Sequence, residues 1–261
     1  MAPHGDQHPY LDWPGPIAFA HRGGTSEAPE NTLPAFEHAV ALGYRYLETD
    51  VHLTADGVLM AFHDEDLSRT CGLDRRIADL TAAELADVLV DGREPMPLMS
   101  HLLERFPAVR FNIDCKSDAA APALIRLVRE HDALDRVCLG SFSHARLLKL
   151  RALLGDRLLT CMSPQEVTSL RVAGRLGGSA RRVAQVPIRY GAPSGPRGVT
   201  VVNARFVRNA HRAGIPVHVW TIDDPGEMHR LLDLGVDGIM TDRPEILRDV
   251  LLERNAWVAP T

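Results

Sequence analysis

The chain alternates short apolar runs with longer stretches in which apolar residues recur at helical spacing. Eight apolar runs of strand length lie at residues 17–20, 44–51, 109–115, 136–140, 157–162, 182–186, 217–220 and 238–240. In the stretch 33–43, apolar residues recur at i, i+3 and i+7, and Asn31 or Thr32 can cap its start. The stretches 203–214 and 224–235 repeat the order of polar cap, apolar stripe and terminal glycine. These patterns predict strands that alternate with helices.

Eight strand–helix units predict a (β/α)8 barrel, the TIM-barrel fold, as a single domain spanning residues 1–261. The alternative is an open doubly wound sheet, but no G-x-G-x-x-G follows the first strand, which weakens that alternative. Residues 64–97 are charged and show no clear strand–helix unit, so we expect a small insertion after strand 2 at one rim of the barrel. Ser179 and the segment 191–198 (GAPSGPRG) are typical of loops.

Composition narrows the class of protein. Hydrophobic residues make up 45% of the 261 residues and charged residues 24%, as in globular proteins. No apolar run approaches the ~18 residues that a membrane span needs, so no stable membrane anchor is expected. A net charge of −5 gives no indication of a nucleic-acid partner. The first fifteen residues lack lysine, arginine and an apolar run, which favours a cytoplasmic location over secretion.

The four cysteines are scattered, and no pair has C-x-x-C spacing. They are Cys71, Cys115, Cys138 and Cys161. Isolated cysteines in a chain of this length are typical of small buried residues in a reducing compartment. Neither a disulfide framework nor a structural zinc site is expected.

Charged residues gather where the predicted strands end. His21 and Arg22 directly follow the first strand, and Glu48 and Asp50 lie two residues apart on the second. Residues two apart on a strand point to the same face, here the barrel interior. In a barrel the carboxyl ends of all strands converge on one mouth, where active sites lie. We therefore expect these side chains to meet.

Further polar residues extend this group. Asp114 and Lys116 lie two apart on the third strand, and His63 follows the short apolar run 58–62. Trp220 ends the seventh strand, and Thr-Asp-Arg-Pro follows the eighth. Trp220 is either a packing residue or a wall for an apolar or glycerol group of a substrate. His211 and His218 fall on a helix and inside a strand, so we interpret them as structural.

Three inward carboxylates in one mouth require a cation. Glu48, Asp50 and Asp114 offer hard oxygen ligands, which suit one divalent ion, Mg²⁺ or Ca²⁺. The alternative is that they form structural salt bridges with Arg22, Lys116 and other bases. His21 and His63 could act as general acid and base, because imidazole titrates near neutral pH. Arg22 and Lys116 could hold a phosphate beside the metal.

At these positions the chain resembles the glycerophosphodiester phosphodiesterase family over about residues 17–250. The motifs that carry the resemblance are HRG at 21–23, APENTL at 28–33, ETDVHLTADGVLMAFHDEDLSRT at 48–70, FNIDCK at 111–116, VWTIDD at 219–224 and GVDGIMTDRP at 235–244. The resemblance implies a barrel with an insertion after strand 2 and a divalent metal held by Glu48, Asp50 and Asp114. It also implies His21 and His63 as the acid–base pair, with Arg22 and Lys116 contacting phosphate.

One residue departs from the family pattern. Asp114 stands where the family usually has glutamate, whose side chain is one methylene longer. The function implied is metal-dependent hydrolysis of glycerophosphodiesters to an alcohol and glycerol 3-phosphate, in glycerophospholipid breakdown.

Two alternatives to this function remain open. One is a lysophospholipase D or sphingomyelinase D-like lipid phosphodiesterase, which an apolar rim at the mouth would favour. The other is a non-catalytic phosphate-binding barrel. The sequence does not decide the oligomeric state.

Overall fold

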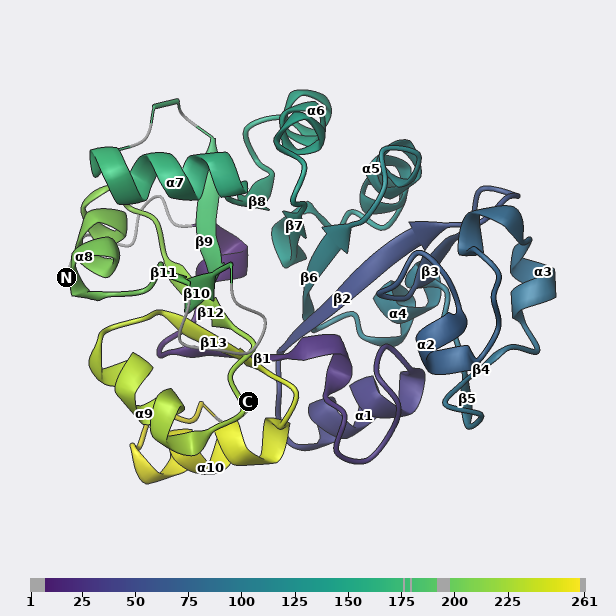
Figure 1. The fold of residues 1–261 in the computed structure, drawn as a ribbon, viewed down its shortest axis with the longest axis horizontal. Helices are drawn as coiled ribbons and strands as arrows, with labels where there is room; N and C mark the ends of the chain where they lie inside the picture. Colours follow the sequence, from purple (N-terminus) through teal and green to yellow (C-terminus); the bar gives the residue numbers. More distant parts are fainter. Residues whose placement is uncertain (1–7, 176, 179, 192–197, 259–261) are drawn as a thin grey trace.

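The computed structural model describes residues 8–175, 177–178, 180–191 and 198–258. Eight parallel strands form a closed barrel, which confirms the predicted (β/α)8 fold and excludes the open sheet (Figure 1). They are β1 (Ile17–Ala20), β2 (Tyr46–Leu53), β6 (Arg110–Cys115), β7 (Val137–Gly140), β8 (Leu159–Cys161), β9 (Arg181–Pro187), β12 (Val217–Trp220) and β13 (Gly238–Thr241). The barrel closes because β1 pairs with β13 on one side and with β2 on the other.

Each predicted strand is present, with its ends displaced by at most two residues. The helices that follow the strands surround the barrel in Figure 1. They are α1 (Leu33–Ala41), α4 (Met99–Arg105), α5 (Ala120–Glu130), α6 (His144–Leu154), α7 (Pro164–Ala173), α8 (Ala204–Arg212), α9 (Pro225–Asp233) and α10 (Pro244–Glu253). Within the described ranges, no helix is long and apolar enough to cross a membrane.

Polar side chains cap two of the three helices for which the sequence predicts a cap. The side chains of Asn203 and Asp224 accept hydrogen bonds from backbone N–H groups in the first turns of α8 and α9. Thr32 occupies the N-cap position of α1, but its hydroxyl donates to the carbonyl of Pro29 and does not cap the helix. The start of α1 is therefore held by the loop that precedes it.

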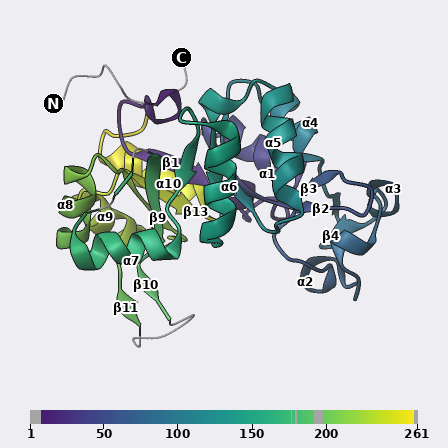
Figure 2. The ribbon, with the colours of Figure 1, turned by 90° about the horizontal axis from the view of Figure 1, so that it is seen from above.

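The insertion after β2 forms a small unit beside the barrel (Figure 2), and it has its own hydrophobic core. β3 (Leu59–Ala61) pairs antiparallel with β2, and short elements follow. These are α2 (Ser68–Cys71), α3 (Ala82–Leu85), β4 (Leu89–Val90) and β5 (Glu94–Pro95). Eight apolar side chains pack together beneath them: Met60, Phe62, Leu67, Ile77, Leu80, Leu85, Val90 and Met96. The predicted insertion is thus present, and it contains no strand–helix unit of barrel type.

The segment before β1 covers the amino-terminal end of the barrel. Its short 3-10 helix (Pro9–Leu11) places the ring of Tyr10 edge-on to Tyr46, and the Tyr46 hydroxyl donates to the Tyr10 carbonyl oxygen at 2.6 Å. Trp13 packs against the same tyrosine. Because this end is filled by aromatic side chains, the other end is the open mouth.

A hairpin of β10 (Arg189–Tyr190) and β11 (Val199–Thr200) follows β9. The loop prediction at Ser179 and at most of the segment 191–198 falls outside the described residues. Cys115, Cys138 and Cys161 are buried, as predicted, whereas Cys71 is only half-buried.

His218 lies inside β12 with no exposed surface, and burial lowers its pKa to about 4. His211 lies on α8, and its Nε2 is 2.8 Å from Asp237 Oδ2. Neither side chain lines the mouth, which agrees with the structural interpretation of both.

The buried His218 imidazole makes the free energy of unfolding depend on pH. Its pKa is lower in the folded than in the unfolded chain, so the unfolded chain takes up the proton first as the pH falls. The stabilisation is complete above pH ~6.5 and is lost toward pH ~4. Between pH 7.5 and 5, His218→Gln should lose about 2 kcal/mol less stability than wild type in urea unfolding. His101→Gln, at an exposed position on α4, is the control. Equal losses in wild type and His218→Gln would contradict the assignment.

Candidate active site

The eight residues predicted to form the site line one cavity of about 170 Å³ at the carboxyl ends of the strands. They are His21, Arg22, Glu48, Asp50, His63, Asp114, Lys116 and Trp220. The structure thus brings together every residue that the sequence assigns to the site. It also adds side chains to the cavity that the sequence did not indicate, among them Asn112, Phe142 and Gln185.

A tight turn after β1 presents His21 and Arg22 to the cavity. Arg22, Gly23 and Gly24 all have positive φ, of 53°, 85° and 88°. A Cβ on Gly23 would lie 2.9 Å from the backbone of α1, so only glycine fits this close approach. The strained backbone of Arg22 lets its N–H donate to Glu48 Oε2 at 3.1 Å. The HRG motif therefore has a steric reason as well as a chemical one.

The carboxylates of β2 and β6 are adjacent because the two strands pair in register. Asp50 lies opposite Asp114. Lys116 Nζ lies 2.7 Å from Asp50 Oδ1 and 2.8 Å from Asp114 Oδ2, and Arg22 Nε lies 3.3 Å from Asp50 Oδ2. The salt bridges considered as the alternative to a metal site are therefore present in this structure. They account for Asp50 and Asp114, but they leave Glu48 without a basic side chain in a short contact.

The charge balance differs between the two carboxylates of β2. Burial and the nearby charge of Asp50 raise the pKa of Glu48 to about 7. Burial would also raise the pKa of Asp50, but Lys116 and Arg22 outweigh it and lower that pKa. Nearby cations therefore stabilise the ionised form of Glu48 less than they stabilise that of Asp50.

Each histidine of the cavity is held by an aspartate through Nδ1. His21 Nδ1 lies 2.6 Å from Asp242 Oδ1, and His63 Nδ1 lies 2.6 Å from Asp64 Oδ1. The second ring nitrogen of His21 lies 3.7 Å from Glu48. An Nδ1 bonded to a carboxylate leaves Nε2 of each ring free for proton transfer.

The two imidazoles differ in electrostatic environment. Burial would lower the pKa of His21, but the carboxylates of Glu48 and Asp242 outweigh it and raise the pKa. Burial lowers the pKa of His63; Asp50 opposes this shift, while Arg22 adds to it. One ring thus favours the protonated form and the other the neutral form.

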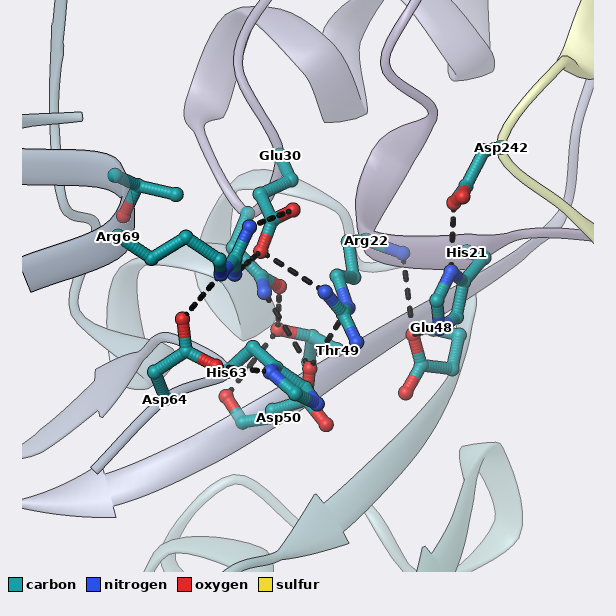
Figure 3. A network of polar contacts seen from close by, with 12 residues as sticks. His21, Arg22, Glu30, Glu48, Thr49, Asp50, His63, Asp64, Arg69 and Asp242 are labelled. Carbon is teal, nitrogen blue, oxygen red and sulfur yellow. Dashed lines mark hydrogen bonds and ion pairs between the residues drawn. The ribbon is translucent and has the colours of Figure 1, made fainter. Parts of the chain in front are cut away.

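Glu30 and Arg69 extend the ionic network away from the cavity (Figure 3). Glu30 accepts a hydrogen bond from Arg22 Nη1 at 3.0 Å and also binds the guanidinium of Arg69. Arg69 in turn contacts Asp64, the partner of His63. The network therefore links the HRG turn to the insertion.

Phe142 and Trp220 form an apolar wall of the cavity. The ring centroids of Phe142 and Trp220 lie 6.1 Å apart with the rings nearly perpendicular, and Phe142 is 60% exposed. On the floor, Gln185 Nε2 donates to Asn112 Oδ1 at 2.9 Å. The cavity thus has one charged wall, one apolar wall and an amide floor.

Comparison with known proteins assigns the chain that forms this cavity to a protein family. The model of the Glycerophosphoryl diester phosphodiesterase family matches residues 21–246, which is most of the chain. The chain belongs to this family.

Relatives of the chain agree with the assignment. "Probable glycerophosphodiester phosphodiesterase 2" of Mycobacterium tuberculosis is 37% identical over 257 residues, covering 95% of each chain. A lysophospholipase D of Homo sapiens is 26% identical, and the matched region covers 89% of this chain and 85% of the human protein. An Oleispira antarctica phosphodiesterase, solved with the product sn-glycerol-3-phosphate, has a TM-score of 0.75 at 22% identity, covering 91% and 97% of the two chains. The last of these shows likeness of fold only.

The donor set of the phosphodiesterase cavity suits a divalent cation, although no preformed site is present. Within the described part of the chain, no three His, Cys, Asp or Glu residues stand together in an arrangement ready to hold a metal. The ligand chemistry nevertheless fits, because Glu48, Asp50 and Asp114 supply hard oxygens, and, among the described residues, Glu48 has no salt bridge as short as those of Asp50 and Asp114 to Lys116. Lys116 lies between the two aspartates in this structure.

Several supporting residues of the phosphodiesterase site were not assigned a role from sequence. Asp242 lies in the Thr-Asp-Arg-Pro run after the eighth strand, and its position at a strand end was the available indication. Glu30 lies in the APENTL motif, but nothing in its spacing indicates contact with Arg22. Phe142 follows β7 and is a lone aromatic residue that sequence alone does not distinguish from a surface residue.

Proposed function

We propose that this phosphodiesterase hydrolyses glycerophosphodiesters to an alcohol and sn-glycerol 3-phosphate. The observation that carries the proposal is a pair of histidines, His21 and His63, each oriented by an aspartate and both lining a cavity with Arg22 and Lys116. Two oriented imidazoles can accept and donate a proton within one displacement. The printed names of the relatives, and the product bound in the Oleispira antarctica structure, support this substrate class.

In the proposed reaction, the phosphate enters beside Arg22 and Lys116. Their positive charges balance the charge that grows on the phosphoryl oxygens. One histidine removes a proton from the nucleophile, which is water or the neighbouring glycerol hydroxyl. The other donates a proton to the leaving alkoxide as the P–O bond breaks. Attack by the glycerol hydroxyl would give a cyclic phosphodiester that water then opens.

A divalent cation completes the proposed site. Glu48, Asp50 and Asp114 would hold Mg²⁺ or Ca²⁺, and the ion would neutralise charge on the phosphoryl oxygens. The shorter Asp114 side chain, where the family usually has glutamate, is proposed to affect which of the two ions is preferred. Lys116 contacts Asp50 and Asp114 in this structure, and a cation that takes over these carboxylates would release its ammonium to contact the phosphate.

Replacing either histidine should abolish most of the proposed activity without unfolding the barrel. In assays of glycerol 3-phosphate release from glycerophosphocholine, His21→Ala and His63→Ala should each lower kcat roughly 10²–10⁴-fold. His211→Ala, outside the cavity, should leave kcat within about twofold. Equal losses in all three variants would refute the assignment. A wild-type protein that binds glycerol 3-phosphate but cleaves no diester would support the non-catalytic alternative.

The apolar wall favours a second candidate, hydrolysis of lysophospholipids. Phe142 is exposed at the rim beside Trp220, the kind of apolar feature that a lysophospholipase D would require for an acyl chain. The similarity to the human lysophospholipase D points in the same direction. The chemistry would be the same, with an acylglycerol in place of glycerol.

Phe142→Ala separates the two candidates. If acyl chains pack on this wall, the variant should lower kcat/KM for lysophosphatidylcholine about tenfold, because burying such a ring contributes on the order of 1.5 kcal/mol. Its kcat/KM for glycerophosphocholine should change less than twofold. Leu148→Ala, at an exposed apolar position on α6, serves as control. Unchanged lysophosphatidylcholine kinetics in Phe142→Ala would remove the second candidate.

A further inference from the structure

Arg69 joins the insertion to two carboxylates at the edge of the cavity. It lies in α2, which the insertion contributes. Its Nε lies 2.5 Å from Asp64 Oδ2, and its Nη1 and Nη2 lie 3.0 and 2.5 Å from the two oxygens of Glu30 (Figure 3). All three nitrogens of the guanidinium are thus engaged, although the side chain is 49% exposed.

Each carboxylate bound by Arg69 is bound in turn to a residue of the site. The other oxygen of Asp64 lies 2.6 Å from His63 Nδ1. Glu30 Oε1 also accepts from Arg22 Nη1 at 3.0 Å. The supports of His63 and of Arg22 therefore meet at one guanidinium, which itself does not line the cavity.

We propose that Arg69 is a positioning residue for the phosphodiesterase reaction. Its planar fork fixes Asp64 and Glu30 relative to each other, and these in turn orient His63 and Arg22. The insertion thereby sets the distance between one acid–base group and one phosphate contact. The inference rests on the proposed function, because it assigns Arg69 a role in the same reaction.

The contacts of Arg69 differ from those of an ordinary surface pair. An exposed ion pair contributes only about 0–1 kcal/mol to stability and has no reason to affect turnover. Arg76, on the same insertion, is such a residue: it pairs with Glu65, and both side chains are largely exposed. Arg76→Met is therefore a matched control for Arg69→Met.

The first test compares steady-state kinetics of glycerophosphocholine hydrolysis. Arg69→Met should lower kcat about 10- to 100-fold, the usual effect of removing a residue that orients site groups. Arg69→Lys should not restore it, because one ammonium cannot reproduce the fork between Asp64 and Glu30. Arg76→Met should keep wild-type kcat. Thermal unfolding of each variant checks that the barrel is intact, and Arg69→Gln replaces Arg69→Met if the latter does not fold. Wild-type kcat in Arg69→Met would overturn the proposal.

A second test distinguishes positioning from direct contact with substrate. In a Glu30→Gln/Asp64→Asn background, the carboxylates through which Arg69 acts are gone, so adding Arg69→Met should lower kcat less than about twofold. If Arg69 itself contacts the substrate, Arg69→Met should lower kcat/KM in that background as much as it does in the wild-type enzyme. Most of this loss should then come from a higher KM. That result would refute the positioning role.

The two tests separate this inference from the proposed function. If His63→Ala loses activity while Arg69→Met and Arg76→Met do not, the function stands and the role of Arg69 is wrong. If the wild-type enzyme cleaves no glycerophosphodiester, both proposals are wrong.

Discussion

Repulsion between inward carboxylates is the constraint around which the mouth of this barrel is built. Parallel pairing of β2 with β6 places Asp50 directly opposite Asp114, and strand periodicity puts Glu48 on the same inner face. Two like charges about 4 Å apart near a protein surface repel by about 4 kcal/mol. Such a cluster persists only with cations beside it, and Lys116 and Arg22 supply part of that charge.

The backbone around this cluster follows from the same requirement. Arg22 reaches Asp50 from a turn with three successive positive φ angles, which two glycines make possible. The N–H of Arg22 meets Glu48, and Glu30 holds the guanidinium from the far side. The insertion then contributes a second arginine to Glu30, so a segment with its own small core is tied to the barrel by charge. One network of ionic contacts thus joins the HRG turn, the carboxylates of the mouth and the insertion.

Much of the fold can be predicted from the spacing of apolar and polar residues along the chain. The contacts within the site can be predicted from that spacing only in part. Apolar runs located the barrel strands, and the i, i+2 spacing of Glu48 and Asp50 correctly predicted that both face the cavity. The partners of those residues depend on tertiary distances that no local pattern contains. Glu30 and Arg69 are 39 positions apart in sequence yet share a bidentate contact.

For the same reason, the sequence does not predict that Asn112 and Gln185 line the cavity. Asn112 and Gln185 are polar residues inside strands, and only barrel closure brings β6 and β9 near enough for their side chains to hydrogen-bond. Lys116 supplies part of the positive charge that the inward carboxylates require, because it contacts Asp50 on β2 as well as Asp114 on β6. The shortage that remains is at Glu48, whose pKa is raised to about 7 by burial and by Asp50.

Calorimetric titration with Mg²⁺ and Ca²⁺ tests most directly whether the carboxylates form a metal site. We expect that wild type binds one ion and that Asp114→Asn weakens binding about tenfold or more, because a carboxylate ligand is lost. Asp114→Glu should change the Mg²⁺–Ca²⁺ preference, because Mg²⁺ tolerates a distorted octahedron poorly. Asp135→Asn, at an exposed carboxylate near the start of β7, should bind as wild type does. Equal affinities in wild type, Asp114→Asn and Asp114→Glu would exclude Asp114 as a ligand, and absence of binding to wild type would contradict the metal site altogether.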